Sequence, residues 1–396
     1  MLNGKLGTPS FCNIPMIYLD NNATTQVAPE VLDAMLPFLG ASFGNPSSAY
    51  SLGRLNAMAV GAARESVADL IGAADPHEIV FTSCGTESDN WAIRGALEAD
   101  RERDHIVTTR VEHEAIRKLC QKLETTGHNV TWLDVNEHGE LNIDQVRNAL
   151  NDRTAIVSVM HANNETGVIF PVEEIAEIVK EHSNALFHVD GVNAVGKIPI
   201  DLKNTEIDLY SISGHKFHAP KGIGALYVRN GFTLPLWFTG GGQESGRRPG
   251  TEAVHQIAGL GAAANLVKDM SAMGRVRSMR NRLESEILDK ITNSRLNGTS
   301  DPAKRLPNTS NISFENTNGE LILARLDDLG VCVSTGSACN AAIHSVSPVL
   351  QAMNIPFIQA MGSIRFSLGR YNNDAEIDFV LQNIPKIVEE IRAMAG

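Results

Sequence analysis

The sequence predicts an α/β fold in which a mostly parallel sheet carries helices on both faces. Seven short runs rich in β-branched residues follow one another between residues 78 and 229. Amphipathic stretches of helical periodicity separate these runs. Beyond about residue 270 the pattern changes to single strands between longer helices, which indicates a second, smaller α+β domain.

The seven predicted strands, taken in order, are EIVFTS (78–83), HIVTTR (105–110), NVTWLDV (129–135), TAIVSVMHAN (154–163), ALFHVDG (185–191), DLYSIS (208–213) and GALYVR (224–229). In open α/β sheets, ligands bind beyond the carboxyl ends of the strands. The residues that follow each run are therefore the candidates for a functional site.

The domain boundary is expected near residue 270, after the glycine-rich stretch TGGGQESGRRPGT (239–251). We expect a large domain over 27–270. The small domain would then combine 1–26 with 271–396, and its strands would include NISFE (311–315) and SIRFS (363–367).

Composition excludes several classes of protein. The chain has 396 residues, 43% of them hydrophobic, and a net charge of -12 without a long basic run, so we expect no direct binding to nucleic acid. No stretch of about 18 apolar residues predicts a membrane span. Five scattered cysteines without CxxC spacing indicate a reducing, cytoplasmic location and no metal site.

A lysine and an aspartate at two strand ends suggest a cofactor. Lys216 follows DLYSIS, and Asp190 ends FHVD, 26 residues earlier. A lone strand-end lysine is more often a solvated surface group. Together, however, an amine that forms a Schiff base and an acid that keeps a pyridine nitrogen protonated are what pyridoxal 5′-phosphate requires.

A phosphate site is expected where FTSCGTESDN passes from strand to helix. The helix is predicted to begin at Thr86 or Glu87, after a turn at Gly85, and its N-terminus would stabilise a phosphate. Ser213 and His215, next to Lys216, offer further donors. Such helix starts are common without ligands, so this signal is weak alone.

Three further residues have both an ordinary and a functional interpretation. His113, in a loop after a strand, is either a structural hydrogen-bonding residue or a flat ring that stacks on the cofactor. Asn164, in MHANNETG, could contact a ring substituent. Arg365 would point to the strand face opposite Ile364 and Phe366, either as a surface residue or as the bidentate partner of a substrate carboxylate.

Two other motifs need separate interpretation. GASFG (40–44) matches the G-x-S-x-G nucleophile elbow, but a helical segment precedes it where the elbow needs a strand, so we reject a serine hydrolase. STGSACN (334–340) places Cys339 among small residues, where a loop could move the thiol between substrate and acceptor. Cys332, in the apolar GVCV, is expected to be the buried thiol.

These motifs together resemble the NifS/IscS type of cysteine desulfurase, within the fold type I pyridoxal-phosphate transferases. The resemblance covers nearly the whole chain, and it rests on the ordered motifs YLDNNATT (18–25), FGNPSS (43–48), TESDN (86–90), ANNETG (162–167), AVGKIPIDL (194–202), SGHK (213–216), RPGT (248–251), GSAC (336–339) and RFSLGR (365–370).

The resemblance implies a role for each matched position. Cys339 would attack the sulfur of L-cysteine, giving alanine and an enzyme persulfide, and could transiently ligate an iron–sulfur cluster. Arg365 would hold the substrate carboxylate, and Asn164 would also contact the substrate. Thr251 would reach the cofactor phosphate of the other subunit in a homodimer. The remaining residues implied to bind the cofactor are Gly85, Thr86, His113, Asn164, Asp190, Asn193, Ser213, His215 and Lys216.

The chain also departs from the family pattern. A glutamine that contacts the ring oxygen corresponds to Asn193, one methylene shorter, and a frequent arginine corresponds to Ser245. After Cys339 the chain reads NAAIHSVSPVL where relatives resemble TSGSLEPSHVL, so Ser345 and Pro348 replace a glutamate and a histidine. These changes leave the acceptor open.

The expected function is therefore desulfuration of cysteine, with sulfur passed to an acceptor or scaffold protein. The destinations left open are iron–sulfur cluster assembly, tRNA thiolation and sulfur modification of DNA. A selenocysteine lyase or an aminotransferase on the same fold is the alternative enzyme, and a non-enzymatic scaffold is the alternative of another class. The group that deprotonates Cys339 is not identified, although His113 is one candidate.

Overall fold

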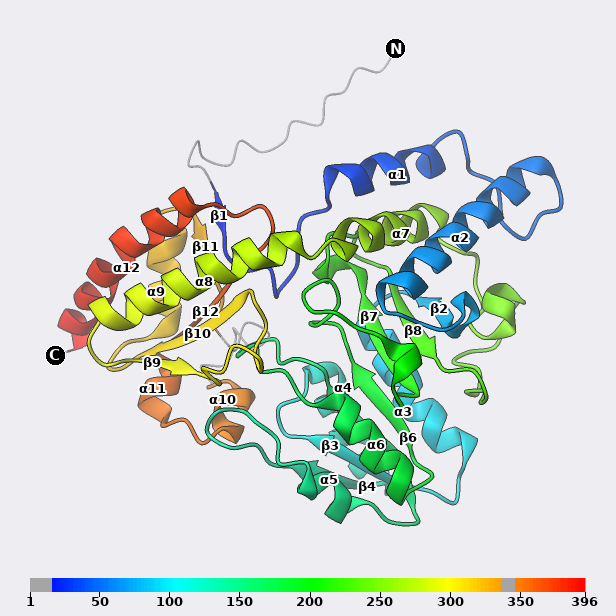
Figure 1. Ribbon diagram of the computed structural model, residues 1–396, viewed down its shortest axis with the longest axis horizontal. Coiled ribbons are helices and arrows are strands. Elements are labelled where there is room, and N and C mark those ends of the chain that lie inside the picture. Colours follow the sequence, from blue (N-terminus) through cyan, green and yellow to red (C-terminus); the bar gives the residue numbers. More distant parts are fainter. Residues whose placement is uncertain (1–15, 336–345, 396) are drawn as a thin grey trace.

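A computed structural model describes residues 16–335 and 346–395 of the chain. Its central feature is a seven-stranded sheet in the order β2-β8-β7-β6-β5-β3-β4 (Figure 1). The strands are β2 (Ile79–Thr82), β3 (His105–Thr109), β4 (Asn129–Leu133), β5 (Thr154–Met160), β6 (Leu186–Asp190), β7 (Leu209–Ser213) and β8 (Gly224–Val228). All seven lie within the predicted runs.

The sheet is mostly parallel, as predicted. Pairs β4–β3, β3–β5, β5–β6 and β6–β7 are parallel, and only β8 runs antiparallel to its neighbours β7 and β2. Six of the seven strands therefore point their carboxyl ends to the same edge. Burial of every residue of β2, β3, β5, β7 and β8 explains their near-continuous apolar sequences.

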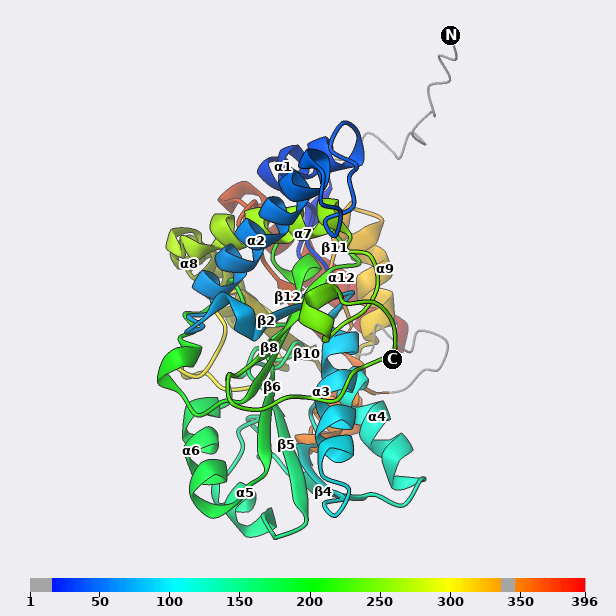
Figure 2. The same ribbon diagram turned by 90° about the vertical axis from the view of Figure 1, so that its right-hand side faces the viewer.

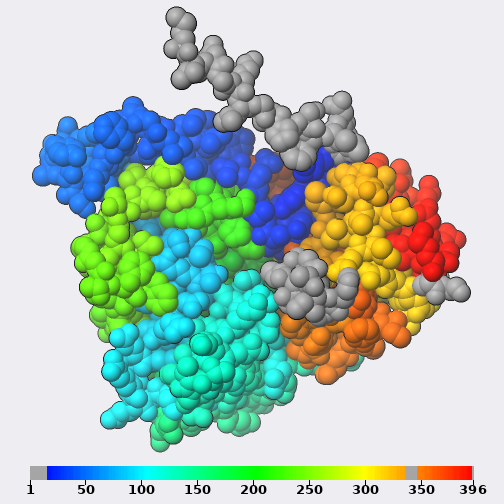
Figure 3. Space-filling view, turned by 180° about the vertical axis from the view of Figure 1, so that it is seen from behind, coloured from blue at the N-terminus to red at the C-terminus, as the bar shows by residue number. Residues whose placement is uncertain are grey.

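Helices cover both faces of this sheet, which Figure 2 shows nearly edge-on. One side carries α3 (Gly85–Ala99) and α4 (Glu114–Glu124), and the other carries α5 (Asp144–Ala149) and α6 (Val172–His182). Helices α1 (Pro29–Leu39), α2 (Ser51–Leu70) and α7 (Val254–Lys268) pack together at one end, where α1 and α2 form a ridge (Figure 3, blue).

A second core lies around a three-stranded antiparallel sheet, β12-β10-β9. Its strands are β9 (Ser294–Asn297), β10 (Thr309–Phe314) and β12 (Ser363–Ser367), and a parallel pair joins β1 (Ile17–Tyr18) to β11 (Val331–Cys332). The helices of this core are α8 (Ser271–Lys290), α9 (Gly319–Asp327) and α12 (Asp374–Ala395), whereas α10 (Pro348–Ala352) and α11 (Phe357–Met361) place their buried residues in the core of the central sheet. The domain boundary near residue 270 stays a prediction.

Three local predictions can be compared with the structure. GASFG follows helix α1 rather than a strand, so the rejection of a nucleophile elbow is confirmed. Helix α3 begins at Gly85, one residue before the predicted range. The prediction that Cys332 is the buried thiol is wrong: β11 pairs with β1 alone and leaves Cys332 half-buried, whereas Cys120 is fully buried.

No helix in the part of the chain that the structure describes combines the length and apolar character needed to cross a bilayer. The longest described helix, α12, carries acidic and basic residues among its apolar positions.

Gly191, the residue after Asp190, connects the core to the edge where strands end. A Cβ at this position would lie 1.8 Å from Cε1 of Tyr210, which is fully buried and bonds through its hydroxyl to Nδ1 of His161 at 2.8 Å. We expect Gly191→Ala to lower the free energy of unfolding by about 1–3 kcal/mol, because an overpacked core must shift. Urea unfolding would measure this change.

Gly274→Ala is the matched control, because no atom lies within 4 Å of a Cβ at this exposed position in α8. This change should leave stability unchanged or raise it by up to about 1 kcal/mol, since alanine favours helix more than glycine does. Equal effects of both substitutions would show that the contact with Tyr210 is not the cause.

Candidate active site

A cavity of about 340 Å³ lies at the carboxyl edge of the central sheet. Five strands lead into it: β2 to Gly85, β3 to His113, β5 to Asn164, β6 to Asp190 and β7 to Lys216. Arg365 on β12 and Pro348 and Val349 on α10 also line it. The predicted site residues that line it are Gly85, Thr86, His113, Asn164, Asp190, Asn193, Ser213, His215, Lys216 and Arg365.

One predicted site residue that the structure describes does not line the cavity. Thr251 is exposed on this chain, in the segment that follows the glycine-rich stretch. Cys339 lies outside the described residues. Ser245 is also exposed and does not line the cavity. The serine that stands here in place of the frequent arginine therefore changes the protein surface.

Lys216 lies in the short helical turn that follows β7. Its Nζ donates to the carbonyl oxygens of Asn22 and Ala23, the latter at 3.0 Å. The N-terminal segment YLDNNATT therefore holds the amine at the cavity, which explains why this early motif accompanies a lysine almost 200 residues later. Asn22 itself is fixed by Thr309 Oγ1 at 2.8 Å.

Asp190 and His113 form the acidic and imidazole parts of the cavity wall. Burial raises the pKa of Asp190, while nearby His113 and Lys216 oppose that rise, and its Oδ1 accepts from the Val192 N–H at 2.9 Å. Burial lowers the pKa of His113, whose Nδ1 accepts from the Ala115 N–H at 3.2 Å and so caps α4. The neutral ring consequently carries its proton on Nε2.

The start of α3 supplies backbone N–H groups to the cavity. Residues in the first turn of a helix have no intrahelical acceptor for these groups. A Cβ on Gly85 would lie 2.6 Å from Cγ2 of Val192, so only glycine lets α3 approach the turn after Asp190. His215 also lines the cavity. Burial lowers the pKa of His215 to about 4, and its Nδ1 forms a hydrogen bond with Oγ1 of Thr24 at 3.1 Å.

Asn193 is engaged within the protein. Its Nδ2 donates to the carbonyl of Asn163 at 3.2 Å, and its Oδ1 accepts from Nζ of Lys197 at 2.7 Å. Lys197 is buried, and burial holds its pKa well below the usual range. The short amide thus belongs to an internal network of described residues.

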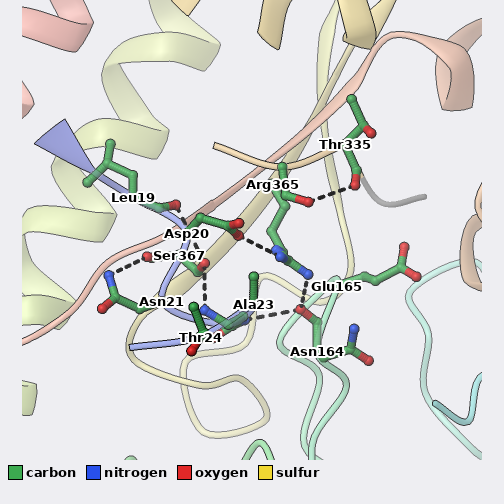
Figure 4. A network of polar contacts seen from close by, with 12 residues as sticks. Leu19, Asp20, Asn21, Ala23, Thr24, Asn164, Glu165, Thr335, Arg365 and Ser367 are labelled. Atoms are coloured by element: carbon green, nitrogen blue, oxygen red, sulfur yellow. Dashed lines mark hydrogen bonds and ion pairs between the residues drawn. The ribbon is translucent and has the colours of Figure 1, made fainter. Parts of the chain in front are cut away.

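Arg365 is buried, with 4% of its surface exposed, and two groups hold its guanidinium (Figure 4). Nη2 donates to Oδ1 of Asp20 at 2.6 Å, and Nη1 donates to the carbonyl of Asn164 at 3.1 Å. Nε is buried and has no hydrogen-bond partner among the described residues. The surface interpretation of Arg365 is therefore excluded, and Ile364 and Phe366 belong to the second core as predicted.

The sequence argument missed several cavity-lining acids. Glu112 is buried with its pKa raised to about 8, mainly by burial, and Glu165 is buried with its pKa raised to about 7 by the same cause. Asp89 is fully buried beside Asp190, and its pKa is raised well above the ordinary value. Asp89 and Glu165 lie in motifs already noted after strand ends, and Glu112 directly precedes His113, so their position was the available signal.

The arrangement fits pyridoxal 5′-phosphate on chemical grounds. A buried acid, an amine and a flat imidazole border one cavity, with helix N–H groups at its end. A cationic ring nitrogen would stabilise the Asp190 carboxylate, whose charge burial otherwise disfavours.

The fold and this cavity define a class of protein, the aminotransferase class-V family, whose pattern the chain matches over residues 17–380. The chain is 52% identical over 382 residues to a cysteine desulfurase of Trichormus azollae, covering 96% of this chain and 94% of that protein. A solved NifS-like protein superimposes with a TM-score of 0.88 at 36% identity over 95% of this chain and 100% of its own.

A solved structure of SspA in complex with cysteine is also similar, with a TM-score of 0.80 and 35% identity over 90% of this chain and 100% of its own. Within class V, the chain belongs to the cysteine desulfurases of the NifS type. The resemblance drawn from the motifs is confirmed.

Proposed function

We propose that the chain binds pyridoxal 5′-phosphate and converts L-cysteine to L-alanine, with the sulfur passing to Cys339 and then to an acceptor protein. The single observation that carries the proposal is the convergence of Lys216, Asp190, His113 and Arg365 on one cavity. SspA, a relative of similar fold, has been captured with cysteine, which supports the substrate.

The cofactor, when bound, supplies an electron-withdrawing ring that stabilises negative charge at the substrate Cα. Asp190 would hold the ring nitrogen protonated, and His113 would stack against the ring. Thr86, Ser213 and the neutral His215 would donate hydrogen bonds to the phosphate, since a neutral imidazole contributes a donor rather than a charge.

Lys216 would move protons at the substrate Cα, because its amine is held at the cavity by two backbone carbonyls. Arg365 would bind the substrate carboxylate. The Cys339 thiolate attacks the substrate sulfur, the carbon–sulfur bond breaks, and a sulfur–sulfur bond forms. Cysteine and thiol become alanine and persulfide with atoms and electrons balanced, so no external oxidant is needed.

A homodimer is part of the proposal. Exposed apolar side chains gather on α1, at the start of α2 and in the loop between them: Leu32, Leu36, Leu39, Phe43, Tyr50, Leu55 and Met58. Clustered exposed apolar side chains of this kind mark protein interaction sites. Thr251, also exposed, would serve the partner's phosphate site. Sedimentation at micromolar concentration should give a dimer, and a monomer would contradict this part.

The proposed activity is tested by purifying the protein with its cofactor and measuring alanine and sulfide from L-cysteine. Wild-type protein should be yellow, lose that colour on borohydride reduction, and form both products. Cys339→Ala should keep the colour but lose cysteine turnover. Retained turnover in this variant would favour a lyase or aminotransferase, and a colourless, inactive wild type would contradict the proposal.

A further inference from the structure

The stretch with Cys339, residues 336–345, lies outside the described part of the chain, but the residues on both sides are described. On its upstream side, Ser334 and Arg365 exchange two backbone hydrogen bonds, N–H of Arg365 to O of Ser334 at 2.7 Å and the reverse at 3.2 Å. On its downstream side, Ser347 donates its hydroxyl to Oε2 of Glu165 at 2.5 Å. Both sides are therefore fixed to the wall of the cavity.

Glu165 occupies a rigid position in that wall. Its N–H donates to Oδ1 of Asn163 at 2.9 Å, and its carbonyl accepts from Nδ2 of Asn311 at 3.3 Å. Its neighbour Asn164 accepts from the Arg365 guanidinium through the backbone carbonyl (Figure 4). The turn that presents the Glu165 carboxylate is thus the same turn that helps to hold the carboxylate-binding arginine.

The hydroxyl of Ser347 has a defined set of partners. Its Oγ accepts from the N–H groups of Val349 and Leu350 at 3.1 and 3.3 Å, which caps α10. The single hydroxyl proton is directed to Glu165. Both side chains are buried, with 3% of Ser347 and 7% of Glu165 exposed, so water does not easily replace the bond.

We propose that Glu165 is a positioning residue which, through Ser347, fixes the downstream side of the Cys339 stretch relative to Arg365. The inference rests on the proposed desulfurase activity, because it concerns the alignment of thiol and substrate sulfur. Sulfur transfer requires that alignment, and a displacement of about 1 Å can cost a factor of about 100 in rate. Binding of a substrate carboxylate at Arg365 does not require it.

The test compares Glu165→Ala, Ser347→Ala, their double variant and Glu165→Gln, all loaded with cofactor. Persulfide on Cys339 is followed by mass spectrometry in a single turnover with L-cysteine. We expect each alanine variant to slow its formation about tenfold or more, and the double variant to be no slower than the single ones, because they remove the same bond. Glu165→Gln keeps an acceptor oxygen and should be close to wild type.

Binding of L-alanine, which has the carboxylate but no sulfur, provides the second readout. Its dissociation constant should change less than about threefold in Ser347→Ala, which leaves the contacts of the Arg365 guanidinium with Asp20 and Asn164 in place. Melting temperatures show whether each variant is folded, and Glu165→Gln and Ser347→Ala keep the test open if Glu165→Ala is unstable.

Three outcomes would overturn the inference. The first is wild-type persulfide formation in both alanine variants, which would leave the bond a purely structural role. The second is additive losses in the double variant, which would assign the effect of Ser347 to capping α10 alone. The third is an equal loss in Glu165→Gln, which would make charge the cause. Failure of wild-type protein to form alanine would contradict the proposed function instead.

Discussion

Replacement of Lys216 by alanine is expected to lower the rate of alanine formation from cysteine by about 10³-fold or more, because proton transfer and covalent attachment depend on one amine. Lys216 lies at the cavity, where two backbone carbonyls of the N-terminal segment hold its Nζ. The residue is half-buried, and its removal should leave the fold intact. Steady-state kinetics would measure the loss of rate, and the absorption spectrum of the purified variant would measure the loss of the covalently attached cofactor.

Lys221→Ala is the matched control, since Lys221 is exposed, lies five residues further on and does not line the cavity. This variant should keep wild-type rates and colour. Lys216→Arg keeps the positive charge but cannot form a Schiff base, so it should be as inactive as Lys216→Ala. Near-normal turnover in Lys216→Arg would show that the charge, rather than the amine chemistry, is what the reaction needs.

The sequence could predict the sheet and most of the site because both depend on local patterns. Seven β-branched runs became the seven strands, and polar residues at or after their carboxyl ends, such as Asp190 and Asn164, converged on one cavity. Parallel strands bring their carboxyl ends to a common edge, so the order of the strands did not have to be known.

Long-range pairings could not be predicted in this way. Asp20 and Arg365 are 345 residues apart, and their ion pair depends on the bridge between Asp20 and Ser367 beside β12. The bond between Glu165 and Ser347 likewise joins two segments that are distant in sequence. Cys332 was assigned to the core from its apolar neighbours, but a two-residue strand paired on one side does not bury it.

Arg365→Lys is expected to lower kcat/KM for L-cysteine by about 10²-fold, mainly through a higher KM. Loss of one partner from a buried, charge-assisted pair costs about 2–5 kcal/mol, and each 1.4 kcal/mol is a factor of ten. The guanidinium is positioned by Asp20 and the Asn164 carbonyl, and a lysine ammonium cannot keep both contacts while offering a planar pair of donors to a carboxylate. Initial rates over a range of cysteine concentrations would separate KM from kcat.

Cysteine methyl ester, which has no carboxylate, tests the assigned partner directly. In wild-type protein, kcat/KM should be about 10²-fold higher for cysteine than for its methyl ester. In Arg365→Lys this ratio should fall below about tenfold, because only the free carboxylate can bind the arginine. Arg325→Lys, at an exposed position of α9, should retain the wild-type preference. An unchanged preference in Arg365→Lys would mean that another group binds the carboxylate.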